Sequence, residues 1–429
     1  MKTGAAWRVY ILGGAMTAGL IVCARHFTDR GGPYFMASLA FACVGYLLSV
    51  REFFATPKFP RRVVVLGLVL GAAWQVVFLR LPAGFDDDIH RYVWDGRLQR
   101  LGYNPYLVVP GDPGVRGLHT PETRSLNNPD LASPYPPGAQ LFFRTVTAIR
   151  ESTFALKLAF VLCDFAIAAL LLNLLRYTGR PEHLVLVFAW NPLLAVEVAG
   201  SGHIDIVGAL LLVLSSVALV RRWRAIAALS FGLAIAVKFL PIVLLPLYWK
   251  RVRIRDAALT AVAVGALYLP FLNHGRVPTG SLGTYVQNFR FNGPVFAAVT
   301  HLASPRVAAA VAVLVGLATA LWMRRRSKES DTPHEQFAWP LAAALFCAPA
   351  VFPWYLLWLL PFLTSTSTLL ILVWTASIIP AYVQWHLRTL GHPWGALPVW
   401  TMVVEYGCVG IAGCIIGLRR IRHKQRLGG

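Results

Sequence analysis

The segment Gly84-Phe85-Asp86-Asp87-Asp88-Ile89-His90-Arg91-Tyr92-Val93-Trp94-Asp95-Gly96-Arg97 directly follows a long apolar run, Val63 to Leu81. Three adjacent carboxylates cannot lie in hydrocarbon, so they mark the point at which the chain leaves a membrane. Carboxylates beside arginines and aromatic rings at a membrane surface could catalyse a reaction on a lipid-linked polar substrate. The alternative interpretation is the start of a solvated loop.

The composition assigns the chain to the membrane class. The sequence is 57% hydrophobic and 14% charged, whereas a soluble domain carries about 25% charged residues. Many apolar runs of about 20 residues recur, and each can cross about 30 Å of hydrocarbon. We therefore expect an all-α, polytopic integral membrane protein. The first run, Val9 to Ala24, has no clear small-residue cleavage site, so we expect it to be a retained helix.

The net charge of +21 does not indicate nucleic-acid binding. Basic residues cluster in short loops between apolar runs, which is the positive-inside pattern and places those loops in the cytoplasm. The six cysteines are scattered without metal-ligand spacing, and we expect no metal. The basic loops are 51–62, 176–180, 221–224, 250–255, 324–328 and 419–426.

The positive-inside pattern predicts about twelve membrane crossings (10–13) in a single domain, 1–429, with both termini in the cytoplasm. The large outer loop 82–152 follows the third span, and a smaller outer segment covers 273–303. The predicted spans are 9–24, 34–50, 63–81, 153–175, 184–200, 204–220, 256–272, 304–323, 336–352, 354–364, 366–383 and 396–418.

The stretch 225–249 differs from the other spans because basic residues flank both of its ends. It also carries Lys238 and Pro241 near its middle. We interpret it as a re-entrant hairpin with Lys238 near the tip, since irregular backbone at depth is tolerated where it lines a cavity. A single tilted helix is the alternative.

Polar residues gather at the predicted outer ends of several spans. Random placement would scatter them over both sides, so this convergence favours one shared site. Carboxylates can act as general bases, cations can hold a phosphate, and ring faces can pack on a sugar. The candidates are Asp86, Asp87, Asp88, His90, Arg91, Tyr92, Asp95, Arg97, Tyr135, Glu197, His203, Asp205, Lys238, Arg290, Asn292, Trp354 and Tyr355.

Several of these candidates have a simpler interpretation. Glu197 and Asp205 could pair with a cation or cap a helix, and His203 could be a hydrogen-bonding turn residue. Trp354 and Tyr355 could belong to the interfacial aromatic belt.

The ordered motifs carry a resemblance to GT-C type glycosyltransferases, polytopic enzymes that use a polyprenyl-phosphate sugar. Asp87-Asp88-Ile89-His90-Arg91-Tyr92 resembles the acidic motif of that family. His90 stands where a tyrosine is expected and Asp86 adds a third carboxylate, so the register of the catalytic aspartate stays open. The motifs similar to a bacterial and archaeal mannosyltransferase-like branch are 87–97, 102–106, Asn191-Pro192 with Glu197, 202–205, 238–241, 291–293 and 353–355.

The resemblance implies transfer of a sugar, with mannose expected, from a polyprenyl-phosphate donor at the outer face of the cytoplasmic membrane. Asp87 or Asp88 would deprotonate the acceptor hydroxyl, and the anomeric configuration would invert. Protein cations would meet the charge of the leaving phosphate, so no cofactor is expected. The acceptor hydroxyl could belong to a glycan, a lipid or a protein. The alternatives are a transporter or flippase of a lipid-linked substrate, and a lipid-phosphate transferase of another kind.

Overall fold

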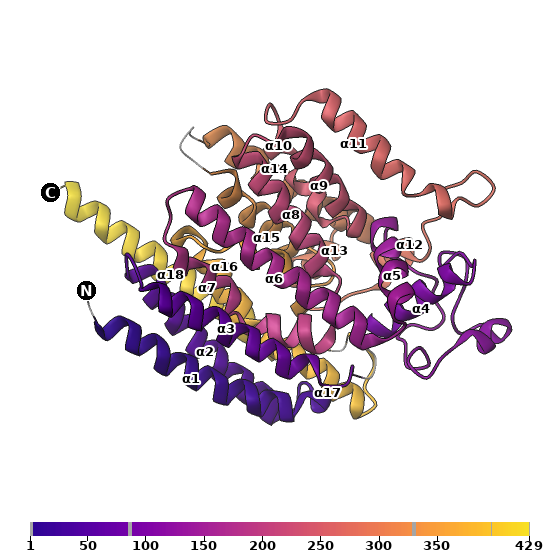
Figure 1. The fold of residues 1–429 in the computed structure, drawn as a ribbon, viewed down its shortest axis with the longest axis horizontal. Helices are drawn as coiled ribbons and strands as arrows, with labels where there is room; N and C mark the ends of the chain where they lie inside the picture. Colours follow the sequence, from indigo (N-terminus) through magenta and orange to yellow (C-terminus); the bar gives the residue numbers. More distant parts are fainter. Residues whose placement is uncertain (1–2, 85–87, 328–331, 396, 429) are drawn as a thin grey trace.

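The computed structural model describes residues 3–84, 88–327, 332–395 and 397–428, and every regular element within these ranges is helical (Figure 1). The expected all-α class is confirmed. The N-terminal half contains α1 (Thr3–Arg25), α2 (Pro33–Ala55), α3 (Arg61–Leu79), α4 (Asp88–Arg100), α5 (Pro137–Ile149), α6 (Thr153–Tyr177), α7 (Val185–Ala189), α8 (Asp205–Val220), α9 (Arg224–Val237) and α10 (Leu245–Tyr248). The C-terminal half contains α11 (Ile254–Ala266), α12 (Leu282–Asn288), α13 (Pro294–Thr300), α14 (Pro305–Arg326), α15 (Ala338–Phe346), α16 (Leu369–Ser377), α17 (Val383–Thr389) and α18 (Val399–Gly428).

The long helices make this a multi-pass membrane protein. In the described part of the chain, eight helical segments are long and apolar enough to cross a bilayer, or nine if one bent pair forms a single span. The predicted crossings 204–220 and 336–352 correspond to shorter helices, α8 and α15. The number twelve therefore stays a prediction. The eight segments are Gly4–Arg25, Pro33–Ala55, Arg61–Leu79, Thr153–Tyr177, Ile254–Phe271, Pro305–Arg326, Thr366–Thr389 and Val399–Arg419.

Local sequence fixes where several of these helices begin. The Ser152 hydroxyl accepts a hydrogen bond from the Ala155 amide and caps the first turn of α6. Proline occupies the first position of α2 and α14, where its missing N–H costs nothing. The N-terminal residues of α2, α6 and α14 therefore separate these long helices from the shorter helices that precede them.

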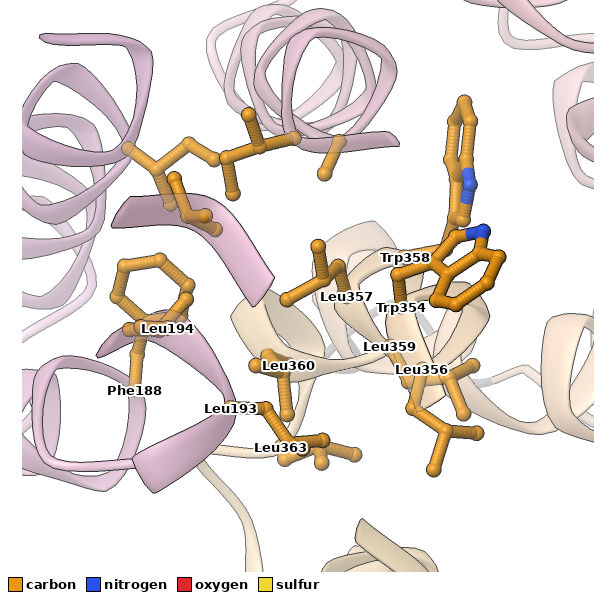
Figure 2. Packing of buried hydrophobic residues seen from close by; sticks show 14 of the residues in the cluster. Phe188, Leu193, Leu194, Trp354, Leu356, Leu357, Trp358, Leu359, Leu360 and Leu363 are labelled. Carbon is orange, nitrogen blue, oxygen red and sulfur yellow. The ribbon is translucent and has the colours of Figure 1, made fainter. Parts of the chain in front are cut away.

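Two broken segments pack against each other in the middle of the bundle. Helix α7 and the π-helical turn Leu194–Ser201 are bent by 58° at their junction. The predicted short span 354–364 is a pair of 3-10 helices, Pro353–Trp358 and Leu360–Phe362. Figure 2 shows Leu357, Leu360 and Leu363 facing the side of Phe188, Leu193 and Leu194. This contact buries leucines and an aromatic ring and holds the irregular backbone in one place.

The stretch 225–249 turns back on itself, as the re-entrant interpretation predicts. Helix α9 packs along α8 and ends at Val237, and Lys238 then lies against Asp205, the first residue of α8. The chain returns through a 3-10 turn and α10 to the other end of α8, where the Tyr248 and Ser215 hydroxyls are 2.6 Å apart. Lys238 is thus at the tip of the hairpin.

The large segment after α3 folds onto the ends of the spans. Helices α4 and α5 pack together, and the Tyr92 ring stacks on Phe143 with the ring centroids 4.4 Å apart. Tyr92 also meets Phe160 of α6 edge to face at 6.2 Å. The acidic motif is therefore attached to the spanning helices through buried aromatic rings.

Candidate active site

A cavity of about 530 Å³ opens where the start of α4, the 126–136 loop, the hairpin tip and α17 meet. Six of the residues predicted from the sequence line it. They are Asp88, Tyr135, His203, Lys238, Trp354 and Tyr355. Residues more than 260 positions apart in the sequence therefore share one site, as predicted from the polar residues at the outer ends of several spans.

Asp88 is the first residue of α4, and both oxygens of its carboxylate are held by neutral donors. Its Oδ1 accepts from the Asn127 side-chain amide at 2.6 Å, and its Oδ2 accepts from the Tyr135 hydroxyl at 3.1 Å. Burial, with the nearby Asp88 charge, raises the pKa of Tyr135 well above its usual range, so the phenol stays protonated and can donate. The positive end of the α4 dipole also favours a carboxylate here. Asp86 and Asp87 lie outside the described residues.

Lys238 brings a positive charge to the same cavity. Its ammonium donates to Asp205 Oδ1 at 2.7 Å and lies 3.8 Å from the centre of the Tyr355 ring. The same Asp205 oxygen accepts from the Trp358 indole N–H at 2.6 Å. Asp205 is buried, whereas Lys238 is partly exposed. The carboxylate thus orients the lysine from behind the cavity wall, and the Tyr355 ring face stabilises the cation.

A stack of rings forms another side of the cavity. The His203 ring lies parallel to Trp354 with centroids 4.1 Å apart, and Trp354 stacks on Phe352 at 4.5 Å. Behind the stack, His203 Nδ1 is 3.0 Å from the buried carboxylate of Glu197, which also accepts from the Tyr382 hydroxyl. Glu197 therefore positions His203 without lining the cavity.

Two predicted residues of α4 support the loop that carries the cavity wall. The Arg91 guanidinium donates to the carbonyls of Asn127, at 3.3 Å, and Asn128, at 2.7 Å. Asp95 Oδ2 accepts from the Ser133 hydroxyl at 2.5 Å and from the Gln140 amide at 2.9 Å. Burial raises the pKa of Asp95 to about 6, and Arg91 and the two hydrogen bonds partly oppose this shift.

Two further predicted residues of the acidic segment face away from the cavity. The His90 ring nitrogens lie 2.6 Å from the Glu122 carbonyl and 3.2 Å from the Gly84 carbonyl. Arg97 donates to the Leu118 carbonyl and to Glu151, both at 2.7 Å. These contacts tie the start of the outer segment to its middle and to its end. Both side chains therefore stabilise the outer segment.

The predicted residues of the second outer segment also lie elsewhere. The Arg290 guanidinium folds back on the backbone carbonyls of Val286 and Phe289, at 3.3 and 2.8 Å. Burial lowers the pKa of Arg290. The Asn292 amide donates to Glu405 of α18 at 2.7 Å. Arg290 and Asn292, which the sequence predicts at the site, therefore make structural contacts away from the cavity.

Sequence reasoning missed Arg388, Asn127, Trp385 and Trp394, all of which line the cavity. Arg388 does carry a signal. It lies between two predicted spans on the outer side, against the positive-inside pattern, so its charge needs another explanation. Asn127, Trp385 and Trp394 have no comparable signal in the sequence. Within the described ranges, no group of three or more His, Cys, Asp or Glu side chains could hold a metal ion.

The fold and the cavity together define a multi-pass membrane protein with a polar site at one end of its helical bundle. The chain belongs to the MptA_B family, because the family model described as "Alpha-(1->6)-mannopyranosyltransferase, N-terminal domain" matches residues 1–252. This membership makes it a glycosyltransferase of the mannosyltransferase type, and it confirms the resemblance given by the motifs. The matched range includes Asp88, Tyr135, His203 and Lys238.

A solved structure of ArnT from Cupriavidus metallidurans, bound to undecaprenyl phosphate, is similar to the chain with 15% sequence identity and a TM-score of 0.48. The similarity covers 83% of this chain and 72% of ArnT. No curated protein matches the sequence.

Proposed function

We propose that the chain transfers mannose from a polyprenyl-phosphate donor to an acceptor hydroxyl in the cavity, with inversion at the anomeric carbon. The observation that carries the proposal is that a carboxylate, Asp88, and an ammonium, Lys238, line one cavity within the part of the chain that matches the family. One group accepts the acceptor's proton while the other meets the charge that develops on the leaving phosphate.

Asp88 is the general base in this proposal. Each carboxylate oxygen has about two lone-pair directions, so the hydrogen bonds from Asn127 and Tyr135 leave room for an acceptor hydroxyl. Those two donors also fix the orientation of the carboxylate, which a base needs to reach the proton at hydrogen-bond distance. Asp87 stays a candidate base from the motif, and Asp86 a candidate for sugar binding.

Lys238 and Arg388 hold the donor phosphate. The ammonium has three N–H groups, and Asp205 accepts from one of them, so donors remain for phosphate oxygens. Arg388 adds a second cation to the lining. Protein cations can neutralise a monophosphate leaving group, and the mechanism needs no metal. Trp354 and Tyr355 offer ring faces to the sugar.

The family description names an α-linked product. Inversion at the anomeric carbon yields an α-linkage only from a β-linked phosphate, so the donor is β-mannosyl. The same description favours the 6-hydroxyl of a mannose residue as the acceptor. The positive-inside pattern supports the outer face of the membrane as the side on which this reaction takes place.

The test uses purified full-length protein in vesicles, with radiolabelled polyprenyl-phosphate β-mannose and an octyl α-mannoside acceptor. Asp88→Asn should lower turnover by about 10²-fold or more, as loss of a general base does. Asp130→Asn is the matched control, because Asp130 lines the same cavity and is exposed. It should stay near the parent rate.

The product's anomeric configuration, read by NMR, tests inversion separately. A β-linked mannoside would contradict the mechanism. Equal turnover by Asp88→Asn and the parent would indicate that the acidic segment is a solvated loop without a catalytic role. Movement of the donor across the bilayer without transfer would favour the transporter interpretation.

A further inference from the structure

A second polar cavity, of about 560 Å³, lies at the opposite end of α3 from the acidic motif. The loop between α2 and α3 forms one wall, and the turn that follows α6 forms the other. Four cations line it, namely Lys58, Arg61, Arg176 and Arg180, together with one carboxylate, Glu182. Helix α3 has 19 residues and is therefore about 28 Å long, so this cavity is remote from the active site.

The cations exceed the carboxylates that neutralise them. Arg176 pairs with Glu182 at 2.9 Å, and Arg180 pairs with Glu335 at 2.6 Å. Lys58 and Arg61 make no hydrogen bond or ion pair with any residue that the structure describes, and they act on Glu182 only through space. Two positive charges are thus uncompensated in one cavity, which favours an anionic ligand.

The helix termini around the cavity add to this field. Helix α3 begins at Arg61, and its N-cap, Pro60, provides no side-chain hydrogen bond, so the positive end of the helix dipole is open. The opposite dipole end, at the C-terminus of α6, is closed because carbonyls there accept from backbone amides. Leu174 accepts from Thr178 at 2.9 Å, and Leu175 accepts from Arg180 at 2.8 Å.

The face of α3 that continues from Arg61 is apolar and exposed. Val65 and Val69 lie one and two turns beyond Arg61, and their side chains are 49% and 60% exposed. Arg61 and Val64 of the same first turns line the polar cavity. An anionic ligand site and an exposed apolar face therefore begin within about one turn of each other, at the end of three candidate spans.

We propose that this end of α3 binds an anionic phospholipid of the surrounding membrane. The phosphodiester lies among Lys58, Arg61, Arg176 and Arg180, and an acyl chain follows the exposed apolar face of α3. The pairing of cations with this face selects a lipid over a free phosphate, since a soluble anion would leave the apolar face uncovered. Basic cavities between spans are suited to such head groups. This site is independent of the transfer reaction.

The test is native mass spectrometry of the delipidated full-length protein in detergent, titrated with an equimolar mixture of phosphatidylglycerol and phosphatidylcholine. The parent should retain phosphatidylglycerol selectively. Lys58→Gln with Arg61→Gln should weaken that binding roughly 30-fold, about fivefold for each cation near a membrane surface. Arg62→Gln is the matched control, because Arg62 is the next residue, is exposed and does not line the cavity. It should change the affinity less than twofold.

A second arm adds millimolar glycerol phosphate or inorganic phosphate to the parent protein. Neither should displace the bound lipid. Complete displacement would show that the site takes a free phosphate and would overturn the proposal. Equal phosphatidylglycerol affinity in the parent and the double variant would overturn it as well. If the double variant fails to fold, Lys58→Gln alone should give the fivefold loss, since that side chain is exposed.

Discussion

Replacing Lys238 by methionine isolates the ion pair behind the active-site cavity. Asp205 is 1% exposed, and its Oδ1 accepts from Lys238 and from the Trp358 indole. Methionine retains most of the side-chain length but removes the charge. Asp205 would then be a buried carboxylate with a single neutral donor, which is the costly arrangement for a charge.

The size of the effect follows from burial. Removing one partner of a fully buried pair costs about 3–5 kcal/mol. Lys238 is 24% exposed, so water reaches part of the pair and the lower value, about 3 kcal/mol, applies. Asp205→Asn in the Lys238→Met background removes the stranded charge and should restore part of the loss. We expect a coupling free energy of about 2 kcal/mol between the two positions.

The assay compares the parent, the two single variants and the double variant in mixed micelles, with unfolding followed by tryptophan fluorescence. Mannosyl transfer is measured on the same four proteins. The double variant should regain stability but not activity, because the ammonium that meets the phosphate is still missing. Additive stability costs of the two single changes would refute the reasoning. So would parent-level transfer by the double variant.

Three further variants test other parts of the structure. Gly208→Ala places a Cβ 1.9 Å from the Trp358 ring, and this overpacking should cost about 1–3 kcal/mol of unfolding free energy. Burial raises the pKa of Asp95 to about 6, so folding takes up a proton and the unfolding free energy falls, on the order of 3 kcal/mol, as pH rises from about 4 to 6. Asp95→Asn should abolish that slope, measured as unfolding free energy against pH. Arg388→Gln should raise the KM for the polyprenyl-phosphate donor by about tenfold, because a charge-assisted phosphate contact is lost.

Each of these variants has a control or a contrary outcome. A Cβ at Gly410 meets nothing within 4 Å, so Gly410→Ala should leave the unfolding curve unchanged. A pH slope that survives Asp95→Asn would assign the proton to another group. Arg290→Gln should leave the donor KM within about twofold, since its guanidinium binds backbone carbonyls. A larger effect for Arg290 than for Arg388 would contradict the placement of the phosphate.

The sequence could locate the long apolar helices and the acidic segment because both signals are local. Apolar runs of about 20 residues and three adjacent carboxylates need no tertiary information to be recognised. The hairpin at Lys238 was predictable for the same reason, since its flanking charges and Pro241 are read directly from the chain. The lengths of the shorter helices α8 and α15 were harder to predict, because hydropathy alone does not show where an apolar run stops being helical.

What the sequence by itself determined is the class of the protein, the end of the bundle at which polar groups gather, and the family whose motifs it carries. These properties follow from hydropathy, charge order and short motifs. Only the tertiary structure decided which of those polar groups share a cavity. The path of the chain brings Arg388 and Asn127 to the cavity. Arg290 instead donates to backbone carbonyls, and Asn292 donates to Glu405. The physical reason is that a polar side chain near a membrane must find a partner, and the identity of that partner depends on packing between distant segments.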